Sequence, residues 1–419
     1  MSPQPVPPKP AIPPLFRPFA GLRPAEGLAA RMAAPPYDVL SSDEARALAA
    51  DNPLSFLHVS KAEIDLAPGT DPHDAAVYAK AGANLRAMIA AGQLVRDPGP
   101  RYYVYQLEGD GHVQTGIVGA AAVADYRANR IRRHEVTRPD KEDDRVHQIE
   151  ACDAQTGPVL LAHPAHPSLA VVTDAARRTA PDAEATTPDG VVHRLWVVSR
   201  PSDIAAITRA FQTMRAVYIA DGHHRSAAAA RVAAARPGAA SAQSFLAVSF
   251  PIGEMRILDY NRVVADLGGR DPAGFLAALE PAFTVEPSDG PARPEAAGRF
   301  GLYLAGKWYR LGLKEPPPAD PVARLDVSLL SDRLLEPLLG ISDPRRDPRI
   351  DFIGGRRGLE ALAARVDSGA AAAFALYPTA MEDLIAVADA GQVMPPKSTW
   401  FEPKLADGLV SLLLDGEGA

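Results

Sequence analysis

The sequence contains little cysteine, few aromatic residues and no excess of positive charge. Cys152 is the one cysteine among 419 residues, which excludes a disulfide framework and any zinc or iron–sulfur site built from several cysteines. Lysine and arginine total 44 against 51 acidic residues, giving a net charge of −7. Proteins whose main task is to bind nucleic acid usually carry a basic face, so this balance argues against nucleic acid as a partner.

Long apolar runs are also missing. No stretch approaches the roughly 20 consecutive apolar residues of a membrane-spanning helix, and the proline-rich start "MSPQPVPPKPAIPP" lacks the apolar centre of a signal peptide. We therefore expect a cytoplasmic protein without a membrane partner. The hydrophobic content of 47% and the charged content of 23% are ordinary for a globular chain.

Strand-like and helix-like patterns alternate along the chain, which predicts an α/β or α+β fold with mixed sheets. A strand is expected over residues 55–64 ("SFLHVSKAEI"), and a capping box at Thr379 and Glu382 is expected to start a helix. The predicted division is a proline-rich arm over 1–15, an N-terminal α/β domain over 16–260 and a C-terminal α/β region over 261–419 whose last loop and strand return to the site.

The stretch "AVYIADGHHRSAAAARVAAA" carries unusual chemistry at the change from a strand to a helix. The strand is expected to end at Ala220, and a helix is expected to start near Arg225. The free N–H groups of a helix start attract anions, an arginine there adds a bidentate phosphate donor, and Gly222 lets the backbone approach a ligand. These features favour a phosphate site, while a plain helix start capped by Asp221 remains the alternative.

A metal site is a further interpretation of the same stretch. Adjacent histidines point about 100° apart on a helix, so His223 and His224 do not easily share one ion. The upstream "HEVTR", with His134 and Glu135, lacks the second histidine of a zincin motif. A metal-dependent hydrolase built on His134, His223 and His224 therefore stays open as an alternative function.

Three other stretches combine charge with a loop or a helix start. "RIRRHEVTRPDKEDDR", residues 130–145, mixes acids and bases that can hold a phosphate, Mg²⁺ and a catalytic base, or can simply be a solvated loop. "GGRRG", residues 354–358, is expected between a strand and a helix. "MPPKSTWFEPK", residues 394–404, is interpreted as a binding loop, with a packing loop as the alternative.

Six motifs in a fixed order resemble a widespread prokaryotic family of uncharacterised proteins that are often labelled ParB-like: "AAPPYDVL", "HEVTRPDKEDDR", "TGPV", "YIADGHHR", "RIDFIGGRRG" and "MPPKSTWFEPKL". The "DGHHR" segment resembles the phosphate-binding turn of the ParB/sulfiredoxin superfamily. That superfamily includes nucleotide-binding partition proteins, ATP-using sulfiredoxins and kinases of free L-serine. The resemblance implies a ParB/sulfiredoxin-like nucleotide-binding core with additional mixed-sheet α/β elements.

Two activities of that superfamily do not match this sequence. We find no helix-turn-helix pattern or basic surface for a partition protein, and no cysteine in the turn for a sulfiredoxin. The remaining expectation is a phosphoryl-transfer enzyme that binds a nucleotide or a phosphorylated metabolite and acts on serine, phosphoserine or a similar hydroxy compound. A ParB-like nucleotide switch without turnover is the alternative from another class.

The site residues expected from the motifs and the resemblance are as follows. The candidate catalytic residues are Glu135, Asp38, His223 and His224, and the candidate Mg²⁺ ligands are Glu142 and Asp144. Mg²⁺ and a nucleotide, ATP or ADP, are the expected cofactors, a small molecule is the expected substrate, and a homodimer is the candidate assembly. The candidate residues for binding nucleotide and phosphate are Asp221, Gly222, His223, His224, Arg225, Arg138, Lys141, Arg145, Lys397, Ser398, Thr399 and Lys404.

Overall fold

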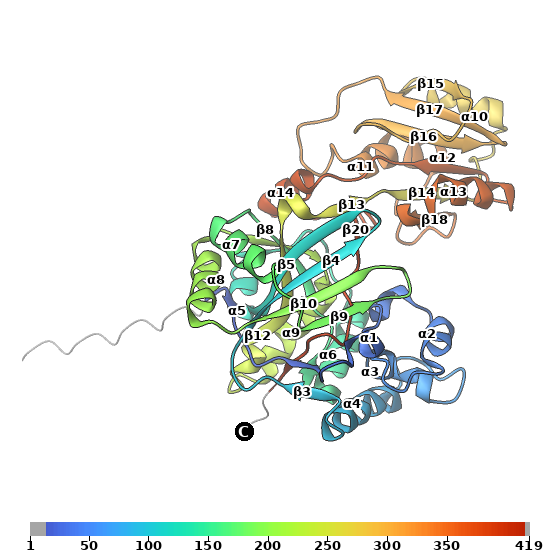
Figure 1. Cartoon of the computed structure of the whole chain (residues 1–419). Coiled ribbons are helices and arrows are strands. Elements are labelled where there is room, and N and C mark those ends of the chain that lie inside the picture. Colours follow the sequence, from blue (N-terminus) through green and yellow to red (C-terminus); the bar gives the residue numbers. More distant parts are fainter. Residues whose placement is uncertain (1–13, 415–419) are drawn as a thin grey trace, which may run out of the picture. The chain divides into compact units, whose positions relative to one another are not determined.

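The computed structural model describes residues 14–414, so nearly all of the expected proline-rich arm lies outside the described residues. The chain divides into two compact units (Figure 1). Unit 1 contains the described residues up to Arg132, then Thr137–Glu254 and the segment from Pro403 onward. Unit 2 contains Arg133–Val136 and Met255–Glu402. Both units combine helices with sheets, which confirms the predicted mixed α/β fold class.

A nine-stranded mixed sheet forms the centre of unit 1. Strand β11 is parallel to β6, β12 is parallel to β8, and the other pairings in the sheet are antiparallel. The short strand β1 (Phe16–Arg17) pairs with β5 beside the main path. The main path runs in the order β6 (Ile131–Arg132), β11 (Val217–Asp221), β8 (Val159–His163), β12 (Ser244–Pro251), β5 (His112–Ala122), β4 (Tyr102–Gly109), β10 (Val192–Val198) and β9 (Ala183–Thr186).

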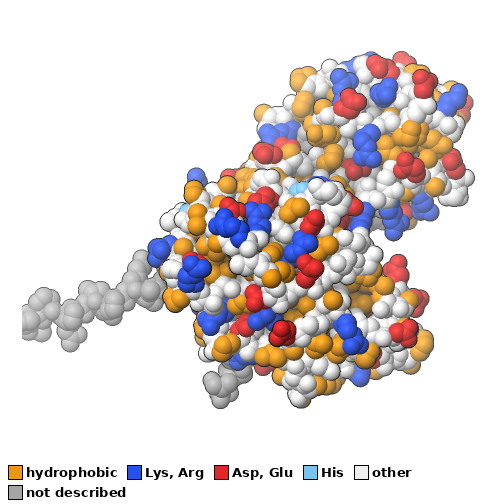
Figure 2. All heavy atoms as spheres, viewed as in Figure 1, with side chains coloured by type: hydrophobic (Ala, Val, Ile, Leu, Met, Phe, Trp, Pro, Cys, Tyr) orange, Lys and Arg blue, Asp and Glu red, His pale blue; other side chains and the backbone are white. Residues whose placement is uncertain are grey.

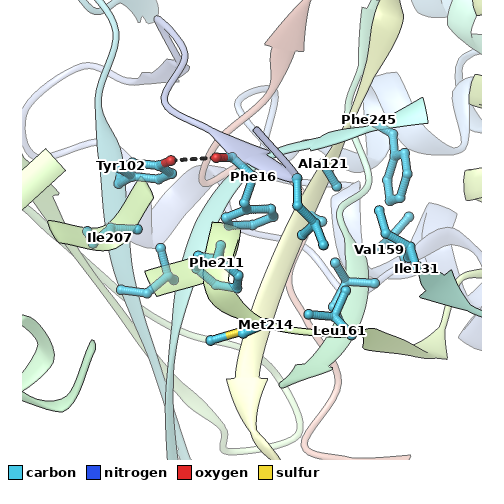
Figure 3. Close-up of a cluster of buried hydrophobic side chains, with 14 of the residues drawn as sticks. Phe16, Tyr102, Ala121, Ile131, Val159, Leu161, Ile207, Phe211, Met214 and Phe245 are labelled. Atoms are coloured by element: carbon cyan, nitrogen blue, oxygen red, sulfur yellow. Dashed lines mark hydrogen bonds between the residues drawn. The ribbon is translucent and has the colours of Figure 1, made fainter. Parts of the chain in front are cut away.

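The hairpin of β4 and β5 follows directly from its sequence. Asp110 and Gly111 both have positive φ, at 51° and 70°, as a tight two-residue hairpin turn requires. Alternate residues of the two strands, among them Tyr102, Val104, Ile117 and Ala121, face the core of unit 1. Figure 3 shows part of this core, where Phe16 packs beside Phe211 and the Tyr102 hydroxyl donates a 2.7 Å hydrogen bond to the Phe16 carbonyl.

Helices flank the sheet of unit 1, and Figure 1 shows α7 and α8 side by side against it. Two of the longer helices, α6 and α9, pack against each other. The helices of the unit are α1 (Ala29–Met32), α2 (Ser42–Ala49), α3 (Leu57–Ser60), α4 (Ala75–Ala90), α5 (Val123–Arg127), α6 (Pro139–Cys152), α7 (Pro167–Ala176), α8 (Pro201–Thr213) and α9 (His223–Ala235), with 3₁₀ turns at Tyr37–Val39, Ala62–Asp65, Ser241–Gln243 and Ile252–Glu254.

The strand predicted over residues 55–64 is wrong. This segment forms α3 and the 3₁₀ turn Ala62–Asp65, and it packs in a second apolar cluster with residues of α2 and α4. A short apolar run cannot be assigned to a strand or a buried helix by its periodicity alone. The error concerns function, because the segment brings Ser60, Lys61 and Glu63 to a cavity described below.

The end of the chain returns to unit 1. The strand β21 (Leu412–Leu413) pairs with β7 (Ala154–Gln155), and Ser411 exchanges backbone hydrogen bonds with Leu22 in β2 (Leu22–Pro24), which also pairs with β3 (Leu94–Arg96). Asp407 likewise exchanges two backbone hydrogen bonds with Ala34, at 3.1 and 2.9 Å. These pairings fix the backbone of a segment that is remote in sequence from the rest of the unit.

Unit 2 is built on a six-stranded antiparallel sheet. Its spatial order is β15 (Phe283–Ser288), β17 (Lys307–Leu313), β16 (Arg299–Leu304), β19 (Ala372–Ala375), β14 (Tyr260–Val264) and β18 (Ile350–Gly354). A separate pair joins β13 (Arg256–Leu258) to β20 (Trp400–Glu402). The helical elements are α10 (Pro272–Leu279), α11 (Asp326–Leu330), a π-helical turn at Ser331–Leu335, α12 (Glu336–Leu339), a 3₁₀ turn at Gly355–Arg357, α13 (Gly358–Asp367) and α14 (Met381–Asp389).

The predicted capping box at Thr379 and Glu382 is wrong, because α14 is preceded by Ala380 and has no side-chain cap. The Thr379 hydroxyl donates to the Ser398 carbonyl instead, at 2.8 Å. The Thr379 side chain therefore bonds to a residue distant in sequence and does not cap the helix.

Basic and acidic side chains are interspersed on the face shown in Figure 2. None of the helices within residues 14–414 combines the length and apolar character needed to cross a bilayer.

Candidate functional site

The site begins where the buried strand β11 passes into α9. The strand-to-helix change that the sequence predicted is confirmed, with Asp221 ending the strand and His223 opening the helix. Gly222 lies between them with φ of +93° and ψ of 31°, a left-handed conformation that suits glycine. A Cβ at this position would also come within 2.9 Å of the Arg225 Nε atom. Gly222 therefore lets the Arg225 side chain fold back over the turn.

Arg225 is held tightly in this position. Its Nη1 donates to the carbonyl of Pro158, and its Nη2 lies 3.6 Å from the Asp221 carboxylate. Burial by itself lowers the pKa of Arg225, but the charges of Asp221 and Asp38 outweigh it and raise the pKa above its usual value. The guanidinium is therefore a permanent cation with an exposed fraction of only 11%.

Lys404 adds a second cation from the returning C-terminal segment. Its Nζ lies 2.9 Å from Asp221 Oδ2. Although burial raises the pKa of Asp221, the charges of Lys404 and Arg225 hold that pKa far below its usual range. Asp221 therefore acts as a charged anchor between two cations, and it joins β11, α9 and the C-terminal segment.

Arg145 supplies a third cation from α6. Its guanidinium stacks on the ring of Tyr37, 3.7 Å from the ring centroid, and its Nη2 lies 2.6 Å from Asp144 Oδ2. Burial raises the pKa of Tyr37 to about 12, although the charge of Arg145 opposes this shift. The phenol therefore stays neutral at physiological pH and serves as a flat support for the guanidinium.

Asp407 is the buried acid of the site. Its exposed fraction is 2%, and no hydrogen bond from another described residue is formed to its side chain. Burial raises the pKa of Asp407 from 3.8 to about 7, helped by the charge of Asp38 and opposed by Arg225 and Arg145. A carboxyl group that titrates near neutral pH can both accept and release a proton under physiological conditions.

A buried chain of hydrogen bonds supports the residue before Asp407. The Tyr105 hydroxyl accepts a hydrogen bond from the Ala406 N–H at 3.1 Å and lies 2.7 Å from His193 Nδ1. His193 Nε2 in turn lies 3.0 Å from the Thr187 hydroxyl. Burial lowers the pKa of His193 to about 4, so the imidazole is neutral. The chain links the sheet of unit 1 to the segment that carries Lys404 and Asp407.

Two neighbouring cavities in unit 1 bring these groups together. The smaller one, which we call cavity A, has a volume of about 30 Å³ and is bordered by both Arg225 and Asp407, and Gly157 lies against each of them. The second, cavity B, has a volume of about 210 Å³ and is bordered by charged residues of α6 and of the segment 61–63. The residues common to both cavities are Tyr37, Ser60, Arg145 and Gln148.

The structure places the predicted histidines beside the turn. His223 is buried in the first turn of α9, and His224 Nε2 accepts a 3.1 Å hydrogen bond from the backbone N–H of Arg138. This bond occupies the Nε2 lone pair of His224. The Arg138 side chain is exposed and paired with Asp140, whereas Asp38 is exposed on the turn Tyr37–Val39 and acts on the cavity through its charge.

The two predicted Mg²⁺ ligands do not form one site. Glu142 and Asp144 are two residues apart on α6, so their side chains project about 200° apart. Glu142 accepts from the Thr137 hydroxyl and pairs with Arg231 at 3.4 Å. Asp144 Oδ1 accepts from the Tyr78 hydroxyl at 2.8 Å, and its Oδ2 is bound by Arg145. These carboxylates fit a structural role better than the binding of a shared ion.

The other predicted site residues belong to unit 2. They are Glu135 in the short segment Arg133–Val136, and Lys397, Ser398 and Thr399 in the loop before β20. The Ser398 hydroxyl is buried and donates to the Pro395 carbonyl at 2.6 Å, so it is committed to the loop itself. Lys397 is exposed and adopts a φ of 59°.

Two of the charged stretches singled out in the sequence, "GGRRG" and "MPPKSTWFEPK", meet within unit 2. "GGRRG" forms the end of β18 and the start of α13, as its sequence predicted. A Cβ on Gly354 would come within 2.9 Å of the Trp400 ring, and Trp400 Nε1 donates to Glu402 at 2.8 Å. Arg356 lies 3.8 Å from the same Glu402 carboxylate. "GGRRG" and "MPPKSTWFEPK" therefore pack on each other.

Sequence reasoning missed Asp407 and Glu63. Asp407 stands in "KLADGLV", where a single acid interrupts an otherwise apolar segment just after the last motif, and that interruption was the available signal. Glu63 was hidden because its segment was interpreted as a strand. Neither position carries a local pattern that assigns it to a cavity.

The turn at Gly222 provides a direct test of this geometry. We expect Gly222→Ala to lower the free energy of unfolding by about 1–3 kcal/mol and to displace Arg225, because the new Cβ needs a positive φ and meets the guanidinium. Denaturant unfolding and pyrophosphate binding measure the two effects. Gly238→Ala is the matched control, since nothing lies within 4 Å of its added Cβ. Equal stability of the two variants would contradict this description of the turn.

The fold and the site together define a mixed α/β protein with a cationic cavity beside a helix start and a buried acid. Residues 16–328 match the family described as "Protein of unknown function (DUF1015)", which covers more than half of the chain. The chain therefore belongs to this family, and the resemblance seen in its motifs is confirmed. A search of curated proteins found no significant match.

Several solved structures are similar to this chain at low identity. A free serine kinase in complex with AMP is 13% identical, covering 68% of this chain and 86% of its own, with a TM-score of 0.33. A conserved hypothetical protein from Pyrococcus furiosus is 13% identical, covering 70% and 93%, with a TM-score of 0.33. C-terminally truncated SbnI from Staphylococcus aureus is 12% identical, covering 70% and 87%, with a TM-score of 0.38. Similarities at this level assign no activity to the present chain.

Proposed function

We propose that unit 1 is a phosphoryl-transfer enzyme that binds a nucleotide or a phosphorylated small metabolite, with a phosphate group at the side chains that border cavity A. One observation carries the proposal: two buried guanidinium groups and a buried carboxyl group that titrates near pH 7 border the same cavity. Arginine pairs geometrically with phosphate, and the first N–H groups of α9 lie beside Arg225. Buried cations of this kind stabilise the charge that develops on a transferred phosphoryl group.

Asp407 is the proposed base. The acceptor hydroxyl transfers its proton to the Asp407 carboxylate as a new O–P bond forms. The bond between phosphorus and the oxygen of the leaving group breaks, and that oxygen keeps the electron pair beside Arg225 and Arg145. The donor is a nucleoside triphosphate or another phosphoanhydride. No step depends on Glu142 and Asp144 as metal ligands, because their geometry does not support a shared ion.

A ligand screen on the full chain tests the proposal. Pyrophosphate, ADP and ATP, each with and without Mg²⁺, are expected to raise the melting temperature, since a ligand at 100 times its Kd adds about 2.7 kcal/mol of stability. Phosphorus NMR with a hydroxy compound as acceptor then detects transfer. Binding without transfer to any acceptor would favour a nucleotide switch, and the absence of any shift with phosphorylated compounds would rule out the phosphate site.

A further inference from the structure

Cavity B contains more charged groups than the phosphate site needs. Its walls include three cationic side chains, Lys61, Lys141 and Arg145, and two carboxylates, Glu63 and Asp144. Arg145 pairs with Asp144 at 2.6 Å, and Lys61 pairs with Glu63 at 3.0 Å. Lys141 is the wall cation that these two pairs leave without a carboxylate partner among the described residues.

Several polar atoms of these walls are not used within the protein. Glu63 Oε1 is bound by Lys61 at 3.0 Å and by the Ser42 hydroxyl at 2.8 Å, but no hydrogen bond from a described residue is formed to its Oε2. The Glu63 side chain is only 5% exposed. Oε2 therefore keeps its capacity to accept a hydrogen bond from a ligand in cavity B.

Arg145 and Lys141 are the cationic donors that face cavity B with unused N–H groups. The Nε and Nη2 atoms of Arg145 are committed to Asp144, whereas Nη1 forms no hydrogen bond to any residue between 14 and 414. Lys141 is exposed at the rim and makes no ion pair with a described residue. Cavity B thus offers one strong acceptor and two cationic donors.

The size and the charge restrict the ligand. A volume of about 210 Å³ is below the roughly 300 Å³ at which pockets for drug-sized ligands begin. A phosphate dianion would exceed the available positive charge and face two carboxylates. One carboxylate group with a separate hydrogen-bond donor matches the arrangement of the unused atoms, because the carboxylate can lie at the two cationic donors and the donor group at the Glu63 acceptor.

We propose that cavity B binds a small monocarboxylate that also carries a hydroxyl or ammonium group, with its carboxylate at Lys141 and Arg145 and its donor group at Glu63 Oε2. Because Arg145 borders both cavities, this ligand lies beside the phosphate of cavity A. Its role as the phosphoryl acceptor rests on the proposed function, whereas its binding does not. The shared chemistry of hydroxy acids and amino acids is a carboxylate with a nearby donor.

Calorimetric titration of the full chain tests the proposal. Glycerate, lactate, serine and alanine are the probes, and glycerol and acetate lack one of the two required groups. We expect binding of at least one of the first four, and at least about tenfold weaker binding of glycerol and acetate. Comparison of hydroxy acids with amino acids identifies which donor Glu63 accepts. If neither class binds, the proposal is wrong.

Matched variants assign the binding to cavity B. Lys141 was expected to bind phosphate, but it borders cavity B and not cavity A. Lys141→Met and Glu63→Gln are therefore each expected to weaken carboxylate binding about tenfold while leaving pyrophosphate binding unchanged. Lys80→Met is the control, because Lys80 is a half-exposed lysine on α4 that lies 3.9 Å from Asp65 and does not border the cavity. Lys141 is exposed, so its variant is expected to fold even if the Glu63 variant does not. Full carboxylate affinity in Lys141→Met would overturn the assignment.

The two proposals fail in different ways. If pyrophosphate binds and is transferred but no monocarboxylate binds, the inference about cavity B is wrong and the proposed function stands. If a monocarboxylate binds in a Lys141-dependent manner but no phosphorylated compound binds, the site in cavity B stands and its role as an acceptor site is wrong.

Discussion

Arg225→Lys is expected to weaken pyrophosphate binding by about 100-fold, or about 2.7 kcal/mol. Lysine keeps the positive charge at the start of α9 but loses the planar fork that reaches Pro158, Asp221 and a phosphate together. The side chain is 11% exposed, so water replaces its contacts poorly. Calorimetry with pyrophosphate measures the loss, and denaturant unfolding shows whether the fold is retained.

Arg231→Lys is the control for this experiment. Arg231 lies six residues further along the same helix, is 45% exposed, and pairs with Glu142 and Asp143 on the surface. The same chemical change at this position is expected to leave pyrophosphate affinity within about twofold, because surface ion pairs contribute little. If Arg225→Lys binds as tightly as Arg231→Lys, Arg225 does not bind the phosphate.

Asp407→Asn is expected to reduce phosphoryl transfer by at least about 100-fold while phosphate binding remains. The amide has nearly the shape of the carboxyl group but cannot accept the proton of the acceptor. Because the pKa of Asp407 is about 7, the wild-type rate at low substrate concentration is expected to fall about tenfold per pH unit below pH 7. This dependence should be absent from the residual rate of the variant.

The same residue predicts an unusual dependence of stability on pH. The pKa of Asp407 is raised from 3.8 to about 7 in the folded state, so above pH 4 the unfolded chain loses this proton while the folded protein keeps it. The stability that the protonated group contributes is complete below pH 4 and is lost as the pH rises to 7. Asp407→Asn avoids this loss, so it should be more stable than the wild type at pH 8, by up to about 4 kcal/mol.

Unfolding curves of wild type and variant at several pH values measure this difference. The gain should grow between pH 4 and pH 7 and then level off. Asp174→Asn serves as the control, because Asp174 is 51% exposed on α7 and pairs only with Arg177 within the described chain. A variant of Asp407 that is less stable than the wild type at pH 8 would show that the charged carboxylate is favourable in its pocket.

Local signals predicted much of the fold. The strand, glycine and helix from Val217 to Ala235 appear as expected, because an apolar run, a residue that tolerates positive φ and an alanine-rich segment act within a few residues of one another. The hairpin of β4 and β5 and the junction at "GGRRG" are correct for the same reason. Where a distant partner competes, as Ser398 does for Thr379, the local pattern fails.

The sequence by itself therefore determined the mixed α/β class, the family and the turn that presents Arg225. Only the tertiary structure decided that the Lys404–Asp407 segment joins this turn, and that Glu63 and Arg145 border a common cavity. These side chains come from segments separated by many residues. Their meeting depends on backbone pairings such as Asp407 with Ala34, and on the burial that moves the pKa of a carboxyl group to about 7. Residue types and their spacing predict neither these backbone pairings nor this burial, because both are properties of the packed chain.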